Sequence, residues 1–213
     1  MMIDEKKIKI IDNFFDDDDF DELTNFEFGN VNSNQIKVHH NMISKDDIIK
    51  SDLLKKELVL KIHNKYHKKV FRLLVELNPQ KAELYDYTDL VLIETGSEYK
   101  YPIHDDTPNK LLSGVIYLSP EKNTGTSFYE NRFGKNKKTI EWKKNRAVFF
   151  SRKEFETWHS YEGNKVSNRI ALVYNLNTYN IKKVYKIENK SYILGKLRYK
   201  VNPYLFEFFK FII

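Results

Sequence analysis

The hydrophobic pattern at the start of the chain predicts a short strand followed by a short helix. Residues 8–14 are mostly apolar and predict the strand. The acidic run Asp16–Asp19 comes next. Because negative charge is favoured at a helix N-terminus, this run indicates where the helix begins. Residues 28–44 are rich in Asn, Ser and Gly and predict a loop with room for one short strand.

One segment has strong helical periodicity. Between Asp46 and Leu77, apolar residues fall three or four positions apart, with Lys and Glu between them. This pattern predicts one long amphipathic helix, or two helices joined near Ser51, with an end at Asn78-Pro79.

After Pro79 the pattern changes to short segments rich in β-branched and aromatic residues, separated by turn residues. The predicted strands cover 84–95, 98–104, 112–119, 126–130, 138–143, 146–151, 168–177 and 182–187. Strands after a helical start predict an α+β fold that is mainly β. The expected architecture is a double-stranded β-helix, or jelly roll, with the N-terminal helices packed on one sheet.

A chain of 213 residues suits a single domain. Within 1–213 we expect a helical N-terminal support over 1–80, a jelly-roll core over 84–177 and a C-terminal extension over 178–213. The final apolar run, NPYLFEFFKFII, is predicted to close the core, because about a dozen residues are too few to span a membrane.

Composition and charge argue against several classes of protein. The chain has no cysteine, which rules out disulfides, thiolate metal sites and cysteine nucleophiles. The first residues, MMIDEKKIKIID, are too charged for a secretory signal, and no apolar run is long enough for a membrane helix. A cytoplasmic protein without membrane contact is therefore expected.

The net charge of +6 is scattered along the chain. The largest basic cluster, Lys135–Lys144, is interpreted as the solvated tip of a hairpin, with contact to a polyanion as the alternative. A nucleic-acid surface interleaves aromatic with basic residues, and this cluster contains only Trp142. The sequence therefore argues against a nucleic-acid partner.

Two of the six histidines have neighbours that suggest a metal site. His104 and Asp106 end a predicted strand, where residues i and i+2 point to the same face, so one imidazole and one carboxylate can reach the same point. His159 supplies a second imidazole from a later segment. Two imidazoles and one carboxylate leave three positions of a metal open, which suits Fe(II) oxygenase chemistry, whereas a closed zinc site needs a fourth protein ligand. The remaining histidines, His39, His40, His63 and His67, are predicted to lie on the surface.

Arg169 lies in a predicted strand ten residues after His159. An arginine inside a β-barrel costs several kcal/mol unless an anion meets it, and its planar guanidinium matches a carboxylate through two parallel hydrogen bonds. The alternative is an arginine at the edge of the strand, paired with a surface Asp or Glu.

Six ordered segments resemble the 2-oxoglutarate/Fe(II) dioxygenase superfamily, and most of all its prolyl 4-hydroxylase-like branch. These are YPIHDD, SGVIYLSP, NTGTSFYE, NRAVFF, TWH and NRIALVYNL, and the resemblance covers about residues 84–177. The opening IKIIDNFF also resembles the usual start of that branch. The chain departs from the family at Thr124-Gly125, where a double glycine is frequent, and at Arg169, where collagen-type members usually carry lysine. The second departure argues against a collagen-type substrate.

The resemblance implies a role for each matching residue. It assigns iron coordination to His104, Asp106 and His159. It assigns 2-oxoglutarate binding to Arg169, Tyr117 and Tyr101, and structural roles to Gly125 and Thr126. The implied cofactors are Fe(II), 2-oxoglutarate as cosubstrate, and O2, and the implied products are succinate, carbon dioxide and a hydroxylated substrate.

The substrate is less well defined than the chemistry. Candidate contacts near the predicted barrel mouth are Tyr129, Arg132, Arg152 and Asn175, whereas Trp142 and Trp158 are predicted to pack. By analogy, the expected reaction is hydroxylation of a prolyl or free amino-acid substrate. Two alternatives stay open: the same chemistry on a small metabolite such as a sugar nucleotide, and a non-enzymatic cupin-like binding module. The sequence predicts no oligomeric state.

Overall fold

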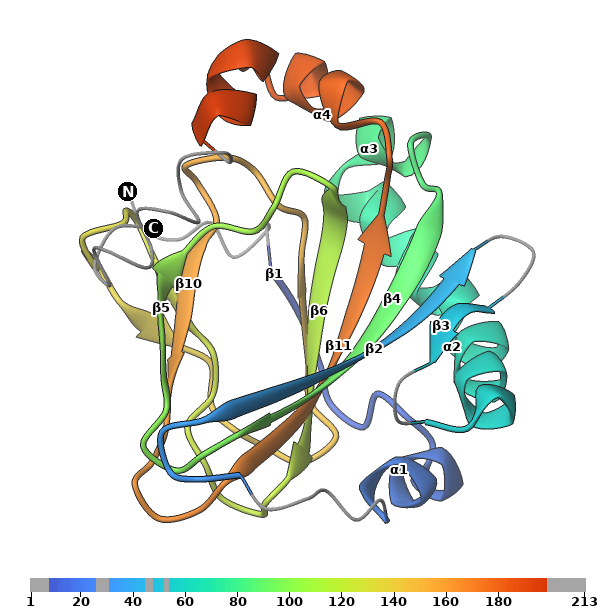
Figure 1. The fold of residues 1–213 in the computed structure, drawn as a ribbon, viewed down its shortest axis with the longest axis vertical. Helices are drawn as coiled ribbons and strands as arrows, with labels where there is room; N and C mark the ends of the chain where they lie inside the picture. The colour runs from blue at the N-terminus through green and yellow to red at the C-terminus, as the bar shows by residue number, and fades with distance from the viewer. Residues whose placement is uncertain (1–7, 26–30, 45–47, 52–53, 199–213) are drawn as a thin grey trace.

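Two antiparallel sheets face each other in the computed structural model, which describes residues 8–25, 31–44, 48–51 and 54–198 (Figure 1). The large sheet has the order β1 (Ile8–Ile11), β9 (Ala147–Phe150), β6 (Lys110–Ser119), β11 (Arg169–Asn177), β4 (Tyr87–Thr95), β2 (Ile36–Ser44) and β3 (Ile48–Ser51). The small sheet has the order β5 (Lys100–His104), β10 (Trp158–Glu162), β7 (Ser127–Tyr129) and β8 (Lys138–Thr139).

Helices cover the outer face of the large sheet (Figure 1). The main one is α2 (Lys56–Leu77), with α1 (Asp17–Thr24) beside it. Its buried stripe includes Leu58, Ile62, Tyr66, Val70 and Leu74, which recur at helical spacing and pack in one core with the outward side chains of the sheet. Each fully buried aliphatic side chain of this kind stabilises the fold by about 1.5–3 kcal/mol. The sheet therefore has one face committed to the core and the other free to build a site.

Two predicted elements were wrong, and one strand was missed. Residues 48–51 form β3 and not the start of a helix, and α2 begins only at Lys56. Residues 182–187 belong to helix α4 (Ile181–Ile187), whose first turn is capped by the Asn180 side chain accepting from the Lys183 amide at 3.2 Å. Strand β10 was not predicted at all. Short apolar runs of four to eight residues fit both a strand and a buried helix turn, so partner strands decide between them.

Only the first part of the basic cluster lies in the hairpin, because residues 140–144 follow β8 and lead to β9. Residues between β7 and β8 form the turn, although β8 itself is shorter than the predicted strand over 138–143. Lysines of the cluster form ion pairs with nearby acids: Lys143 lies 2.9 Å from Asp12 and Lys135 lies 3.7 Å from Glu130. In the described part of the chain no helix is both long and apolar enough to cross a bilayer. The C-terminal run NPYLFEFFKFII lies outside the described residues.

His63 and His67 are half-buried against the sheet, which corrects the prediction that they lie on the surface. Their rings lie 4.5 Å apart on α2. Burial, and then the neighbouring His67, lowers the pKa of His63 from 6.5 to about 4.

This shift predicts that acid destabilises the fold through His63. Below pH 6.5 the unfolded chain takes up a proton that folded His63 refuses until about pH 4, so stability falls as the pH falls through this window. We expect the melting temperature of a His63→Gln variant to fall less steeply than that of the wild type between pH 6.5 and pH 4. Near pH 8 the His63 imidazole is neutral in both the folded and the unfolded chain, so the melting temperatures of the two proteins should depend on pH equally there. Equal dependence between pH 6.5 and pH 4 as well would contradict the prediction.

Candidate active site

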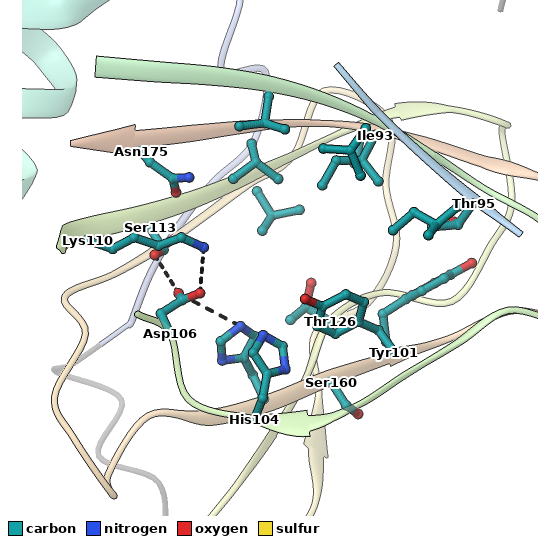
Figure 2. A pocket seen from close by; sticks show the side chains of 18 of the residues that line it. Ile93, Thr95, Tyr101, His104, Asp106, Lys110, Ser113, Thr126, Ser160 and Asn175 are labelled. Carbon is teal, nitrogen blue, oxygen red and sulfur yellow. Dashed lines mark hydrogen bonds and ion pairs between the residues drawn. The ribbon is translucent and has the colours of Figure 1, made fainter. Parts of the chain in front are cut away.

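A cavity of about 290 Å³ lies between the two sheets. Because side chains alternate along a strand, every second residue of β4 and β11 faces it. These residues are Asp89, Val91, Ile93 and Thr95 on β4, and Arg169, Ala171, Val173 and Asn175 on β11. The small sheet supplies the opposite wall through β5 and β10 (Figure 2). The cavity floor is therefore apolar in its middle and polar at both ends.

The structure brings His104, Asp106 and His159 together at one wall of this cavity. His104 ends β5 and is the direct register partner of His159 on β10, and Asp106 follows two residues later. One ligand atom from each of the three lies within 4.8 Å of the other two. Among the described residues this is the one such group of metal-binding side chains. A facial set of two imidazoles and one carboxylate fits Fe(II).

Backbone carbonyls fix how the two imidazoles present themselves. His104 Nδ1 donates to the carbonyl of Pro102 and His159 Nδ1 donates to that of Thr157, each at 2.9 Å. Because a carbonyl only accepts, each Nδ1 carries a proton, which leaves Nε2 as the ring nitrogen that could coordinate a metal. Burial, and then His159, lowers the pKa of His104 to about 3, which keeps this imidazole neutral.

Asp106 is held in the charged form. One of its oxygens lies 2.6 Å from Lys110 Nζ, and the other accepts from Ser113 Oγ at 2.6 Å (Figure 2). Burial opposes ionisation, but Lys110 and the two histidines outweigh it and hold the pKa of Asp106 well below its ordinary range. The donor set therefore contains one carboxylate that is held ionised.

Arg169 lies at the far end of the same cavity without an acidic partner. Its side chain is buried, and its Nε has no hydrogen-bond partner among the described residues. The guanidinium carbon lies 3.9 Å above the Tyr161 ring, and 5.4 and 5.6 Å from the rings of Trp142 and Tyr117. The surface ion pair considered from the sequence is not found in the described part of the chain. Burial lowers the pKa of Arg169, so an anion arriving here would be strongly favoured.

The two tyrosines assigned to cosubstrate binding occupy different positions. Tyr101 lines the cavity, with its ring 4.5 Å from that of His104. Tyr117 is fully buried behind Thr126, which itself lines the cavity. The Tyr117 hydroxyl donates to Thr126 Oγ1 at 3.1 Å and accepts from the Thr126 amide at 2.8 Å. Gly125 is required beside it, because a Cβ there would lie 1.8 Å from the carbonyl oxygen of Ile140.

Of the four candidate substrate contacts, only Asn175 lines the cavity. Tyr129 is buried, with its hydroxyl 2.9 Å from Ser160 Oγ, and Arg132 is exposed with its guanidinium on Phe133. Arg152 is completely buried outside the cavity, where its Nε and Nη1 donate to protein acceptors. Tyr129, Arg132 and Arg152 were predicted to lie at the barrel mouth from their positions along the chain relative to the metal-binding residues. The sequence does not show in which direction their side chains point.

The sequence analysis also missed polar residues of the cavity. His40 lies on β2 and not in a loop, and its Nδ1 lies 3.0 Å from Asp89 Oδ2 inside the cavity. Lys110 and Ser113 join them on β6. The alternation Asp89, Val91, Ile93 was a usable signal for an inward face, but only pairing in register shows which inward residues meet.

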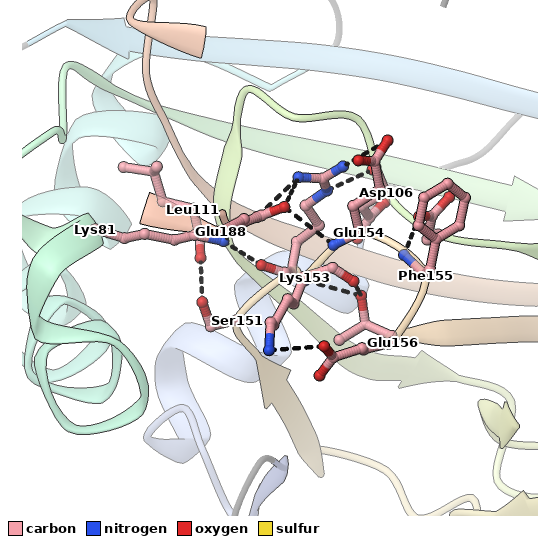
Figure 3. Close-up of polar contacts among 12 residues, drawn as sticks. Lys81, Asp106, Leu111, Ser151, Lys153, Glu154, Phe155, Glu156 and Glu188 are labelled. Carbon is pink, nitrogen blue, oxygen red and sulfur yellow. Dashed lines mark hydrogen bonds and ion pairs between the residues drawn. The ribbon is translucent and has the colours of Figure 1, made fainter. Parts of the chain in front are cut away.

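A second buried cluster holds the segments that carry the metal ligands (Figure 3). Arg152 Nε donates to the backbone carbonyl of Asp106 at 3.0 Å, and Arg152 Nη1 donates to both oxygens of Glu188 at 2.8 and 2.7 Å. Lys81 Nζ lies 2.6 Å from the same carboxylate and also donates to the carbonyl of Arg152. Glu188 at the end of α4 is therefore linked through Arg152 to the backbone of a metal ligand.

Asp105 forms the other half of this cluster. Its carboxylate accepts from the Phe155 amide at 3.0 Å and from Arg198 Nη2 at 2.6 Å, and Arg198 also binds Glu154 at 2.7 Å. Around the turn that leads to β10, three cations thus face three anions: Lys81, Arg152 and Arg198 face Asp105, Glu154 and Glu188. The residue between the two ligands of the H-x-D pair is turned away from the cavity and anchors the strand end.

Comparison with known proteins found similarity in the fold alone. No family model and no curated protein matches the sequence. Among solved structures, a prolyl-4-hydroxylase of Pseudomonas putida is 13% identical, with a TM-score of 0.55 over 82% of this chain and 94% of that one. A 2OG-Fe(II) oxygenase family protein of Burkholderia pseudomallei is 15% identical, with a TM-score of 0.57 over 82% and 85%. The chain has the fold of the 2-oxoglutarate/Fe(II) oxygenases.

A third structure with this fold is a Trichoplax adhaerens prolyl hydroxylase in complex with a peptide fragment of hypoxia inducible factor. It is 14% identical, with a TM-score of 0.56 over 84% of this chain and 87% of that one. The prolyl-hydroxylase-like branch expected from the sequence motifs is thus represented among the proteins that share the fold.

Proposed function

We propose that the protein is a non-haem Fe(II)/2-oxoglutarate-dependent dioxygenase that hydroxylates a C–H bond of a prolyl or free amino-acid substrate. One observation carries the proposal: a buried arginine that has no acidic partner among the described residues shares one cavity with two imidazoles and a carboxylate. The fold and its prolyl-hydroxylase neighbours support it. We further propose that the two sheets form a double-stranded β-helix, with 84–177 as the catalytic core of a single domain.

The residues present fit both cofactors. His104, Asp106 and His159 would hold Fe(II), because their donors converge and each imidazole uses Nδ1 for a backbone carbonyl, which leaves Nε2 for the metal. Arg169 would hold the distal carboxylate of 2-oxoglutarate by charge-assisted hydrogen bonds. When bound, the pair supplies the oxidative chemistry: O2 converts 2-oxoglutarate to succinate and carbon dioxide, and one oxygen atom enters the substrate C–H bond.

The protein's own contribution is binding, orientation and exclusion of water. The apolar middle of the floor, Val91, Ile93 and Val173, keeps the space between the metal ligands and Arg169 dry. A dry site strengthens the pull of Arg169 on a carboxylate. A cupin-like module that only binds a metal would have no use for a buried arginine in the same cavity, so Arg169 favours the enzyme.

Arg169 gives the direct test of cosubstrate binding. We expect Arg169→Leu to raise the KM for 2-oxoglutarate roughly 100-fold, since two charge-assisted hydrogen bonds worth about 1.5 kcal/mol each are lost and 1.4 kcal/mol is a factor of ten. Succinate release measures it, together with the weak visible charge-transfer band of the anaerobic Fe(II) and 2-oxoglutarate complex. Arg72→Leu, on the exposed face of α2, is the matched control. A wild type that neither shows the band nor releases succinate would refute the function.

A further inference from the structure

Asn175 is a buried polar side chain that the proposed chemistry does not use. It is 2% exposed and faces the cavity from β11, at the end opposite Arg169. Its Oδ1 is buried and has no hydrogen-bond partner among the described residues. An unsatisfied buried acceptor costs about 1–3 kcal/mol, so its presence in a cavity wall points to a partner supplied by a ligand.

The position of Asn175 places that ligand beside the metal. Asn175 is the direct register partner of Ser113 on β6, and the Ser113 hydroxyl donates to Asp106 (Figure 2). On its other side Asn175 is the register partner of Asp89 on β4. Side chains of such partners lie about 4.5–5.5 Å apart at Cβ, so one small group can contact both. If Asn175 holds a functional group of the ligand, the carbon atom attached to that group lies next to His104, Asp106 and His159.

Support of the metal ligand does not explain Asn175. Both oxygens of Asp106 already accept hydrogen bonds of 2.6 Å, from Lys110 and from Ser113. The amide of Asn175 offers one acceptor oxygen and two N–H donors, so it complements a group that has both kinds of atom. A carboxylate has no donor for Oδ1, and an ammonium has no acceptor for the N–H groups.

We infer that the substrate carries a primary carboxamide beside the hydroxylated C–H bond, held by Asn175 with help from Asp89 and Lys110. A carboxamide has two N–H donors and an oxygen with two lone pairs. One N–H and one lone pair match the Asn175 amide in a paired arrangement. The second N–H meets the carboxylate of Asp89, which is anchored by His40, and the second lone pair meets the Lys110 ammonium. This inference rests on the proposed function and narrows its amino-acid substrates to asparagine, glutamine and amidated residues.

Matched acid and amide pairs test the inference. The probes are L-asparagine with L-aspartate, L-glutamine with L-glutamate, and L-prolinamide with L-proline. Ligand-observed NMR measures binding to the full chain, and the stimulation of succinate release above the uncoupled rate measures productive binding. We expect at least one amide to bind roughly ten-fold more tightly than its acid, because a site built to hydrogen-bond a group rejects the analogue that leaves its polar atoms unpaired.

Variants at position 175 separate recognition from structure. Asn175→Leu removes the amide at similar volume and should bring each pair to within about two-fold, because the discriminating hydrogen bonds are gone. Asn175→Asp keeps the acceptors, removes the donors and should also lose the amide preference. The ratio of amide to acid binding is the readout in both variants. Asn64→Leu on the exposed face of α2 should keep the wild-type preference and the uncoupled succinate release, and serves as the control.

The outcomes distinguish the two proposals. Uncoupled succinate release by the wild type with no amide preference, or with no probe bound, overturns the inference and leaves the oxygenase standing. An amide preference that persists in Asn175→Leu also overturns it. Loss of uncoupled turnover in Asn175→Leu would show that Asn175 serves the metal and not the substrate. No uncoupled turnover in the wild type refutes the proposed function itself.

Discussion

Replacing Asp106 with alanine is expected to abolish the iron-dependent release of succinate from 2-oxoglutarate. The substitution leaves the imidazoles of His104 and His159 as the remaining members of the donor set. Asp106 is the one anion of the donor set, and the nearby Lys110 ammonium, once unpaired from it, would repel a cation. Removing a residue that supports a metal ligand costs 10–100-fold in affinity, so the loss of the ligand itself should exceed roughly 100-fold.

The measurement is a titration with Fe(II) or Co(II), followed by visible absorption without oxygen. Asp86→Ala is the matched control, since Asp86 lies at the start of β4 and binds Thr178 outside the cavity. The melting temperature of metal-free Asp106→Ala should fall, because Lys110 loses its partner in a largely buried ion pair, so metal affinity is compared at a temperature where both proteins are folded. A metal affinity of Asp106→Ala equal to that of the wild type would refute the assignment of Asp106 as a metal ligand.

Alternation along a strand is what made the metal site predictable. The H-x-D pair needs only two residues of one strand end, and their common direction follows from the period of two. His159 was placed by resemblance, although its own strand β10 was not predicted. The register partner of His159 is His104, and register depends on pairing between segments far apart in the chain, which a single sequence does not display.

Side-chain direction explains the failures. Arg152 follows β9 closely and carries the charge expected of a substrate-binding arginine. It nevertheless faces away from the cavity, because it forms an ion pair with Glu188, which lies 36 residues later in the chain. Nothing near Arg152 in the sequence marks Glu188 as its partner. The same holds for His40 and Asp89, which meet only because β2 and β4 are neighbours in the sheet. Local patterns thus gave the inward strands, and long-range pairing decided which polar groups meet.

Exchange of Glu188 for glutamine is expected to destabilise the fold and weaken metal binding together. Glu188 offsets the buried cations Lys81 and Arg152, and its loss leaves both without full compensation in a dry environment. Breaking a buried ion pair by removing one partner costs about 3–5 kcal/mol. For a chain of this size each kcal/mol lowers the melting temperature by roughly 2–4 °C, so a decrease of roughly 6–20 °C is expected.

The effect on the metal follows from Arg152, whose Nε holds the carbonyl of Asp106. Once Glu188 no longer fixes the guanidinium, the strand end that carries the ligand loosens, and Co(II) affinity should fall 10–100-fold even at temperatures where the variant is fully folded. Glu76→Gln is the matched control, because its exposed ion pair with Lys9 is worth at most about 1 kcal/mol.

A double variant distinguishes a charge effect from a packing effect. Glu188→Leu alone leaves two buried cations, whereas Glu188→Leu with Arg152→Met removes one of them, so the double variant should be more stable than the single one. It should not recover Co(II) affinity, because the hydrogen bond to the Asp106 carbonyl is then missing altogether. If Glu188→Gln has the same melting temperature as Glu76→Gln and binds Co(II) as tightly as the wild type, the buried ion-pair cluster neither stabilises the fold nor positions Asp106. Stability restored without metal affinity would instead locate the function of the cluster in a single hydrogen bond from Arg152 to a backbone carbonyl.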